Sequence, residues 1–168
     1  MRRDELLDAA ESLLAEQGTQ ALTLTAVAER AGVSKGGLLY HFNSKEALIR
    51  SLVERLIADF DESIAAQEGD TYTERYLAAT LAAIRGDRLR RWAVVTGATG
   101  DPTLLAPLRE AMTRWQREEL DQEADPMAAR IVRLACEGLW EVATHAPGVY
   151  TDEQLRELER HLLDLLSG

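Results

Sequence analysis

The chain has 168 residues, of which 46% are hydrophobic and 29% are charged, a globular composition for one to one and a half average domains. Its formal net charge of −10 excludes a strongly basic nucleic-acid coat protein and a polybasic membrane binder. Its one cysteine, Cys136, excludes an intramolecular disulfide. No apolar run approaches the roughly 18 residues of a membrane span, and the charged residues after Met1 predict no signal peptide. We therefore expect a cytoplasmic protein without a membrane partner.

The charge is uneven along the chain. Residues 1–50 carry six Lys or Arg and seven Asp or Glu, a net charge of −1, whereas the other 118 residues carry thirteen and twenty-two, a net charge of −9. The chain has seventeen arginines but only two lysines, Lys35 and Lys45, which both lie in one stretch of eleven residues. This stretch is a candidate for contact with an anionic partner.

The hydrophobic pattern is helical nearly throughout, without the alternation that indicates strands. Helices are expected at residues 3–17, 24–31, 35–41, 45–66, 71–85, 88–96, 103–122 and 126–145, with a ninth after Thr151. Pro107 lies within the seventh, which therefore either begins at residue 106 or is kinked. The sequence predicts an all-α fold in which an N-terminal three-helix head is joined by a long helix to a helical bundle. We place the domain boundary between residues 1–44 and 45–168.

Residues 23–42 have the proportions of a helix-turn-helix. Two short helices flank a tight turn that contains Gly32, and Val33 is the apolar residue expected between them. The second helix of such a unit enters the major groove of DNA with its N-terminal end.

The residues of that second helix suit contact with DNA. Lys35 can reach a guanine edge or a phosphate, and two glycines, Gly36 and Gly37, favour a close approach of the backbone to another molecule. Tyr40, His41 and Lys45 lie further along, where they could hold phosphates. The start of the fourth helix at Ser44 offers backbone N–H donors to a further phosphate.

The stretch TLTAVAERAGVSKGGLLYHFNSKEAL, residues 23–48, resembles the DNA-binding head of TetR-type (tetracycline-repressor-like) transcription regulators. The matching features are Thr23, Val27-Ala28, Ala31-Gly32-Val33-Ser34, Lys35-Gly36, His41-Phe42 and Lys45-Glu46-Ala47-Leu48, all in register. The resemblance covers roughly the first third of the chain. Over the rest, only the number and arrangement of helices agree.

The resemblance implies a homodimeric repressor that binds a palindromic operator of double-stranded DNA and is released by a small effector. The arginine-flanked, otherwise apolar middle region indicates a hydrophobic or amphipathic effector. The implied DNA contacts are Thr25, Ser34, Lys35, Gly36, Gly37, Tyr40, His41 and Lys45. In the family a tyrosine usually follows the leucine that corresponds to Leu38. Here Leu39 takes that position and the tyrosine comes one residue later, about 100° around the helix.

The resemblance also implies an effector pocket in the middle helices and a dimer interface built from the last two helices. The candidate pocket residues are Phe60, Tyr76, Trp92, Met112, Trp115, Cys136 and Trp140. Ordinary core packing remains the alternative for each of them. The candidate interface residues are Ile131, Ala135, Leu139, Leu155, Leu158, Leu162 and Leu165, and the last four have heptad spacing.

No enzyme, cofactor or metal motif is recognisable. The cysteine, glutamate and histidines at positions 136, 137, 145 and 161 lack the helical spacing of a shared metal site. There is no nucleophile elbow, phosphate-binding loop or HExxH sequence. We therefore expect no enzyme activity. Two other readings remain: a helical protein-interaction module whose head no longer binds DNA, supported by the acidic average and Leu39, and a small helical enzyme.

Overall fold

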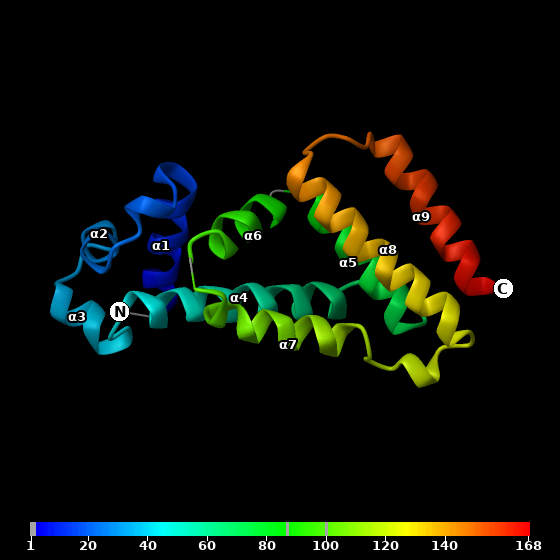
Figure 1. The fold of residues 1–168 in the computed structure, drawn as a ribbon, viewed down its shortest axis with the longest axis horizontal. Coiled ribbons are helices and arrows are strands. Elements are labelled where there is room, and N and C mark those ends of the chain that lie inside the picture. Colours follow the sequence, from blue (N-terminus) through cyan, green and yellow to red (C-terminus); the bar gives the residue numbers. More distant parts are fainter. Residues whose placement is uncertain (1–2, 87, 100) are drawn as a thin grey trace. The chain divides into compact units, whose positions relative to one another are not determined.

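A computed structural model describes residues 3–86, 88–99 and 101–168, and these residues form helices and no strands (Figure 1). The described α-helices are α1 (Arg3–Gln17), α2 (Leu24–Arg30), α3 (Lys35–His41), α4 (Lys45–Ala65), α5 (Tyr72–Arg85), α6 (Arg88–Thr96), α7 (Ala106–Trp115), α8 (Pro126–His145) and α9 (Asp152–Ser167). The 3₁₀ turns between them are η1 (Thr19–Ala21), η2 (Pro102–Leu105) and η3 (Leu120–Gln122). The predicted all-α fold is confirmed.

Side-chain caps explain why several helices begin where the sequence predicts. The hydroxyl oxygens of Thr23, Ser34 and Ser44 each accept a hydrogen bond from the backbone N–H three residues later, at 3.0–3.1 Å. Thr71 and Thr151 complete capping boxes at the starts of α5 and α9. These caps satisfy backbone donors that a helix start otherwise leaves without partners.

The seventh helix, predicted over residues 103–122 with a start at residue 106 as one alternative, does begin at Ala106 but ends earlier than predicted. The chain forms η2 first, then α7 from Ala106 to Trp115, and then a turn in which Glu119 adopts a left-handed conformation with φ of 48°. Residues 116–119 are all polar, so no apolar stripe continues beyond Trp115 to hold a longer helix against a core. Pro107 lies in the first turn of α7, where proline is tolerated.

The first compact unit comprises Met1–Ile57 and Arg91–Glu110. Within it, α1 packs against α2 and α2 packs against α3. Its fully buried side chains include Leu6, Leu7, Leu14, Leu22, Leu38, Phe42, Leu48 and Leu52. Four of these come from α1 and the segment that follows it, two from α3 and its C-terminal end, and two from the first half of α4. The hydrophobic core of the three short helices therefore also orients α3.

The second unit comprises Ala58–Arg90 and Ala111–Gly168. Here α5, α8 and α9 lie side by side, each in contact with the other two (Figure 1). Its core includes Leu77, Leu81, Ala129, Val132 and Cys136, which lie on the facing sides of α5 and α8. The predicted domain boundary at residue 44 differs from both compact units and stays a prediction.

Candidate nucleic-acid interface and effector cleft

The turn between α2 and α3 has the geometry that its sequence requires. Gly32 has a φ of +70°, a conformation that side-chain-bearing residues rarely adopt. The backbone N–H of Val33 donates to the carbonyl of Ala28 at 2.9 Å, which closes the end of α2. Ser34 then caps α3 through the N–H of Gly37. The two helices are therefore joined by a short, hydrogen-bonded turn, as a helix-turn-helix requires.

The predicted DNA contacts lie on the first turn of α2, along α3 and at the start of α4. Those that are exposed are Thr25, Ser34, Lys35, Gly36, Gly37 and Tyr40. The other two, His41 and Lys45, are half-buried. Leu38 and Phe42, at 0% and 1% exposure, anchor α3 in the core, as expected. The structure thus makes this surface available to a partner, but the contacts with DNA stay predictions.

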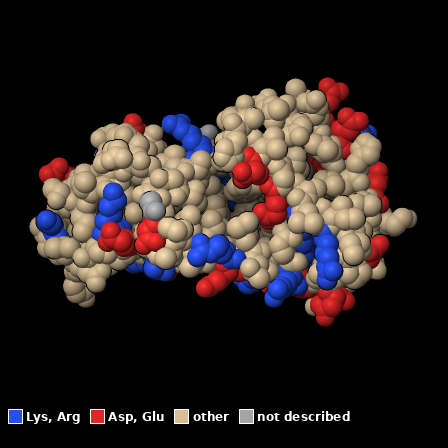
Figure 2. Space-filling view, in the orientation of Figure 1, with Lys and Arg blue, Asp and Glu red and all other residues tan. Residues whose placement is uncertain are grey.

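Ion pairing distinguishes the lysines of the first unit from two of its arginines. Arg30 and Arg55 are held by carboxylates of α1 at 2.7 and 2.6 Å. The hydrogen bonds from Arg30 lower the pKa of Glu16 to about 2, so this pair stays charged at neutral pH. Within the described part of the chain, neither Lys35 nor Lys45 forms an ion pair. On the face drawn in Figure 2, basic groups are scattered among acidic ones over the α1 to α3 region and form no continuous patch.

Leu39 and Tyr40, where the sequence departs from the usual family pattern, are exposed on α3. Tyr40 is 88% exposed and Leu39 is 39% exposed. The Tyr40 ring meets the His41 ring edge-on, with centroids 5.2 Å apart. Tyr40 therefore projects from the helix, and its contact with DNA stays a prediction.

Four of the predicted pocket residues form one aromatic cluster in the second unit. The Phe60 ring lies 5.7 Å from Tyr76, 4.9 Å from Trp115 and 5.5 Å from Trp140, always edge to face. Phe60, Tyr76 and Trp115 are buried, and Trp140 is half-buried. Edge-to-face pairs are the favoured packing of aromatic rings, so this cluster is also a well-packed core.

A carboxylate lies against this cluster. Glu137 accepts hydrogen bonds from the Tyr76 hydroxyl at 2.5 Å and from the Gln116 side-chain amide at 3.1 Å. Burial, with the nearby Glu137 charge, raises the pKa of Tyr76. The phenol is therefore a neutral donor at physiological pH. Sequence reasoning missed Glu137 and Gln116 as partners of the aromatic residues, because nothing in their spacing marks the contact.

The other three predicted pocket residues are dispersed. Cys136 is buried, and burial raises the pKa of its thiol to about 12. Met112 is 38% exposed, and Trp92, which is buried, belongs to the first unit. The structure therefore brings Cys136 onto α8 beside Glu137 but does not join Trp92 and Met112 to the aromatic cluster. Their assignment to a pocket stays a prediction.

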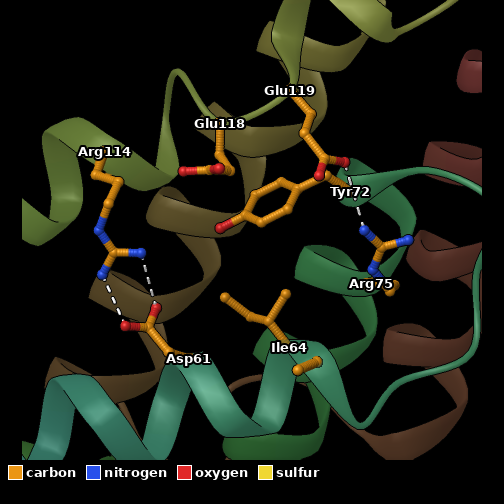
Figure 3. Close-up of a pocket in the computed structure, with 8 residues that line it drawn as sticks. Asp61, Ile64, Tyr72, Arg75, Arg114, Glu118 and Glu119 are labelled. Atoms are coloured by element: carbon orange, nitrogen blue, oxygen red, sulfur yellow. Dashed lines mark hydrogen bonds and ion pairs between the residues drawn. The ribbon is translucent and has the colours of Figure 1, made fainter.

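An open cleft of about 370 Å³ lies in the second unit (Figure 3). Its lining residues come from α4, α5, α7 and the turn after α7: Asp61, Ile64, Ala65, Tyr72, Arg75, Arg114, Glu118 and Glu119. None of the seven predicted pocket residues lines it. No sequence pattern marks this cleft, because its charged residues fit a solvated helix surface and come from four separated segments.

Two ion pairs flank the cleft, and the Tyr72 ring lies between them (Figure 3). Arg114 forms a bidentate pair with Asp61 at 2.7 and 3.1 Å, whereas Arg75 pairs with Glu119 at 3.5 Å. Burial raises the pKa of Tyr72 to about 12, which keeps its hydroxyl protonated. The cleft therefore combines a charged rim with an apolar floor.

A buried charge network supports Tyr72 from behind. Arg133 is fully buried, with its guanidinium 4.9 Å from the centre of the Tyr72 ring. It donates to the Thr73 hydroxyl at 2.9 Å, to the Trp115 carbonyl at 3.0 Å and to Glu123 at 3.2 Å. Burial alone would raise the pKa of Glu123, but hydrogen bonds from Thr73 outweigh it and lower that pKa. The network therefore links α5, α8 and the segment after α7.

Trp115 connects the cleft to the aromatic cluster. Its indole N–H donates to Asp61 at 2.7 Å, while its ring packs on Phe60. A ligand that displaced the side chains at Asp61 would therefore change the surroundings of a tryptophan.

The outer side of α8 is apolar and exposed. Met127, Ile131, Leu134 and Val142 are 59, 47, 64 and 38% exposed and follow one another at helical spacing. Gly138 lies in the same row, and a Cβ added there would meet nothing within 4 Å. Sequence reasoning included only Ile131 of this row, because the residues chosen beside it followed the opposite, inward stripe of α8.

The other predicted interface residues have mixed exposure. Leu139 and Leu155 are buried within the chain at 7 and 3%, whereas Leu165 is 41% exposed. The rest are half-buried: Ala135, Leu158 and Leu162. The structure thus places Leu139 and Leu155 in the core of the second unit, and the dimer interface stays a prediction.

Comparison with known families finds two matches that together span most of the chain. Residues 6–52 match bacterial regulatory proteins of the tetR family, and residues 70–167 match the tetracyclin repressor-like C-terminal domain. The HTH-type transcriptional repressor KstR2 of Rhodococcus jostii is 39% identical over 69 residues, which are 39% of this chain and 34% of that protein. The chain thus matches about a third of the length of this curated relative.

Solved structures share the whole fold. A transcriptional regulator from Rhodococcus sp. Rha1 has a TM-score of 0.76 and 22% identity, covering 100% of this chain and 97% of that one. The multidrug binding protein EbrR, complexed with ethidium, has a TM-score of 0.68 and 22% identity, covering 96% and 98%. At these identities the likeness concerns the fold alone. No described helix is both long and apolar enough to cross a membrane.

Proposed function

The chain belongs to the tetR family of bacterial regulatory proteins, and from this premise we propose that it is a homodimeric repressor released from a palindromic operator by a small amphipathic effector. The observation that carries the proposal is the exposed surface of α3 and the start of α4. There, within the described part of the chain, Lys35 and Lys45 form no ion pair, whereas Arg30 and Arg55 are held by carboxylates. Because the net charge repels DNA, binding depends on a few placed cations, doubled by dimerisation.

In this proposal residues 1–44 form the DNA-binding domain and residues 45–168 form the effector-binding and dimerisation domain. The DNA surface consists of Thr25, Ser34, Lys35, Gly36, Gly37, Tyr40, His41 and Lys45. Lys35 binds a guanine edge or a phosphate, and Lys45 binds a phosphate at the start of α4. Leu38 and Phe42 hold α3 rigidly against the core, so that these groups are presented in a fixed arrangement.

The exposed row on α8 supports the dimer. A contiguous apolar surface of this kind is unfavourable in water and typical of an interface. In a two-fold dimer the same surface of both subunits forms the interface. Each subunit would therefore bury its own copy of Met127, Ile131, Leu134 and Val142. Leu158, Leu162 and Leu165 of α9 extend this surface, because α9 packs beside α8.

The cleft beside Tyr72 supports an amphipathic effector. Its floor of Ile64, Ala65 and the Tyr72 ring suits an apolar group, and its ion pairs suit a polar head. The buried aromatic cluster lies directly behind it through Trp115. That EbrR, a protein of similar fold, was solved with ethidium supports the binding of a small molecule by this fold.

The DNA-binding proposal is tested by fluorescence anisotropy with a labelled duplex from the region upstream of the protein's own gene. We expect saturable binding to this duplex, or to one recovered by selection from random sequences, that weakens as salt rises. Lys35→Ala should weaken it at least about tenfold, because both half-sites lose a contact. The matched control is Arg117→Ala, an exposed arginine of the second unit, which should bind as the unmodified chain does.

A chain that dimerises but binds no selected duplex better than scrambled DNA would contradict the proposal. That outcome would favour the alternative, a protein-interaction module. Effector binding is tested separately by titrating tryptophan fluorescence with amphipathic compounds, with Tyr72→Ala as the variant. A response that Tyr72→Ala leaves unchanged would exclude the cleft as the site.

A further inference from the structure

The outward face of α3 is defined by the residue that points inward. Leu38 is fully buried, and each residue of an α-helix is rotated by about 100° from the last. Gly36 and Tyr40 therefore lie nearly opposite Leu38, and Leu39 lies beside Tyr40. This agrees with exposures of 88% for Tyr40 and 39% for Leu39.

The chemistry of this face is unusual for a helix that reads DNA. Bases are commonly recognised by bidentate hydrogen bonds from Arg, Lys, Asn or Gln. Of these residues the sequence of α3, KGGLLYH, contains only Lys35, at its start. Beyond Lys35 at its start, the outward face presents two glycines, an aliphatic side chain and an aromatic ring.

The glycines are not demanded by the fold of the head. Neither Gly36 nor Gly37 has a positive φ, and a Cβ built on either would meet only the Ser34 hydroxyl, at 4.0 and 3.4 Å. Because glycine destabilises a helix, two in succession indicate a function outside packing. Their effect is to leave the backbone of α3 bare, so that the helix can lie close to the floor of a groove.

Thymine is the base that matches an apolar reader. Its C5-methyl group projects into the major groove, where the other bases present mainly hydrogen-bonding groups. Leu39 and Tyr40 are successive exposed residues with apolar side-chain surface, 39 and 88% exposed, beyond the bare backbone of the two glycines. The Tyr40 ring lies edge-on to the His41 ring, with centroids 5.2 Å apart.

We propose that Leu39 and Tyr40 determine operator specificity by packing against thymine methyl groups in each half-site. The inference rests on the proposed DNA-binding function and specifies what that surface reads. Lys35 supplies a charged contact at the N-terminal end of α3, and the apolar pair selects T·A base pairs further along the groove. The displaced tyrosine, Tyr40, thereby contacts a base in place of the phosphate contact usual in the family.

The test uses thymine and deoxyuridine, which differ only by the C5-methyl group. The full-length protein first selects duplexes from a random pool, and each thymine of the selected half-site is then replaced by deoxyuridine. At one or two positions we expect affinity to fall about fourfold for one substitution, the value for one buried methyl group. Substituting both half-sites should lower it by about tenfold or more.

Variants separate methyl recognition from changes in DNA shape. With Leu39→Ala or Tyr40→Ala, the ratio of thymine to deoxyuridine affinity should approach one at the position that side chain reads. Tyr40→Phe keeps the ring and should retain the preference. Lys45→Ala should weaken binding to both duplexes equally. Both alanine variants alter exposed side chains, and circular dichroism and sedimentation verify that helix content and dimerisation are retained.

Specific binding that is indifferent to deoxyuridine at every thymine would overturn the inference and leave the proposed function intact. A thymine preference that survives both alanine variants would also overturn it, because the methyl groups would then be read elsewhere. Failure to bind any selected duplex would instead overturn the proposed function, and this inference with it.

Discussion

Among the residues that the structure describes, Lys35 and Lys45 of the first unit form no ion pair, whereas Arg133 and Glu123 of the second unit are buried against each other. The two regions thus use charge for different ends. An exposed lysine contributes little to stability and is available to a phosphate. A buried pair cannot reach a partner, but it holds the surrounding segments in one arrangement. Substitutions should therefore affect binding in one region and folding in the other.

The largest expected effect is on the buried pair. Arg133→Met removes the cation and leaves the Glu123 carboxylate buried, which should lower the free energy of unfolding by about 3–5 kcal/mol. Urea denaturation measures this. The matched control is Arg85→Ala at the more exposed pair with Glu159, which should cost about 1 kcal/mol or less. A loss below 1 kcal/mol for Arg133→Met would remove the contrast between the regions.

The buried pair of Arg133 and Glu123 should also make the free energy of unfolding depend on pH in the acid range. The pKa of Glu123 lies below the unfolded value of 4.5, so its contribution to stability is present above that pH. It is lost as the pH falls through the lowered folded value. Glu123→Gln should flatten this part of the profile of unfolding free energy against pH. An unchanged profile would show that the carboxylate does not titrate as described.

The next effect concerns the apolar row of α8. The second unit thus also has an exposed binding surface, but this surface is apolar, whereas the lysine-bearing surface of the first unit is charged. Leu134→Asp places a charge at a residue that is 64% exposed in the chain, so each subunit should still fold. Two aspartates would meet in the dimer, and its affinity should fall by about a hundredfold or more. Sedimentation measures the dimer and circular dichroism the fold. A stable Leu134→Asp dimer would place the interface elsewhere.

A smaller effect is expected at Lys45. Lys45→Ala should lower the slope of log affinity against log salt by about two for the dimer, roughly one for each lost phosphate contact. Unfolding free energy should hardly change, because Lys45 has no ion pair among the described residues. An unchanged slope would show that Lys45 does not contact phosphate and would weaken the proposed difference between the lysines and the paired arginines.

The smallest effect tests the paired arginines. Arg30→Ala should return the Glu16 titration midpoint from about 2 toward 4.5, as followed by NMR. Because the pKa of Glu16 is lower in the folded chain, any stability that the pair contributes is present above pH 4.5 and is lost as the pH falls toward 2. Both side chains are solvent-accessible, so operator affinity and unfolding should change little. A large loss of operator affinity would mean that Arg30 faces DNA despite its pair.

The head was the more predictable region because its signals are local. The predicted bounds of α3 match the structure, since the capping residues Ser34 and Ser44 and the turn at Gly32 mark its surroundings within a few positions. The assignment of this stretch to DNA rests on the same short motif. Nothing in that motif required knowledge of the distant chain.

The second unit was less predictable because its sites depend on distant contacts. The cleft joins Asp61, Tyr72 and Arg114 from three helices, and charged residues of this kind also occur on any solvated surface. On α8 apolar residues occupy both sides, so periodicity alone did not show that Leu139 packs inward while Leu134 faces out. Tertiary packing decides that choice.

The Arg133 network also orders events during synthesis of the chain. Its members Thr73, Trp115, Glu123 and Arg133 span 60 residues, so the interior of the second unit stays incomplete until α8 has been made. The contacts among α1, α2 and α3 close within the first 41 residues. A nascent chain can therefore pack α1, α2 and α3 together early. The second unit can complete its core only after α8, which carries Arg133, has emerged from the ribosome.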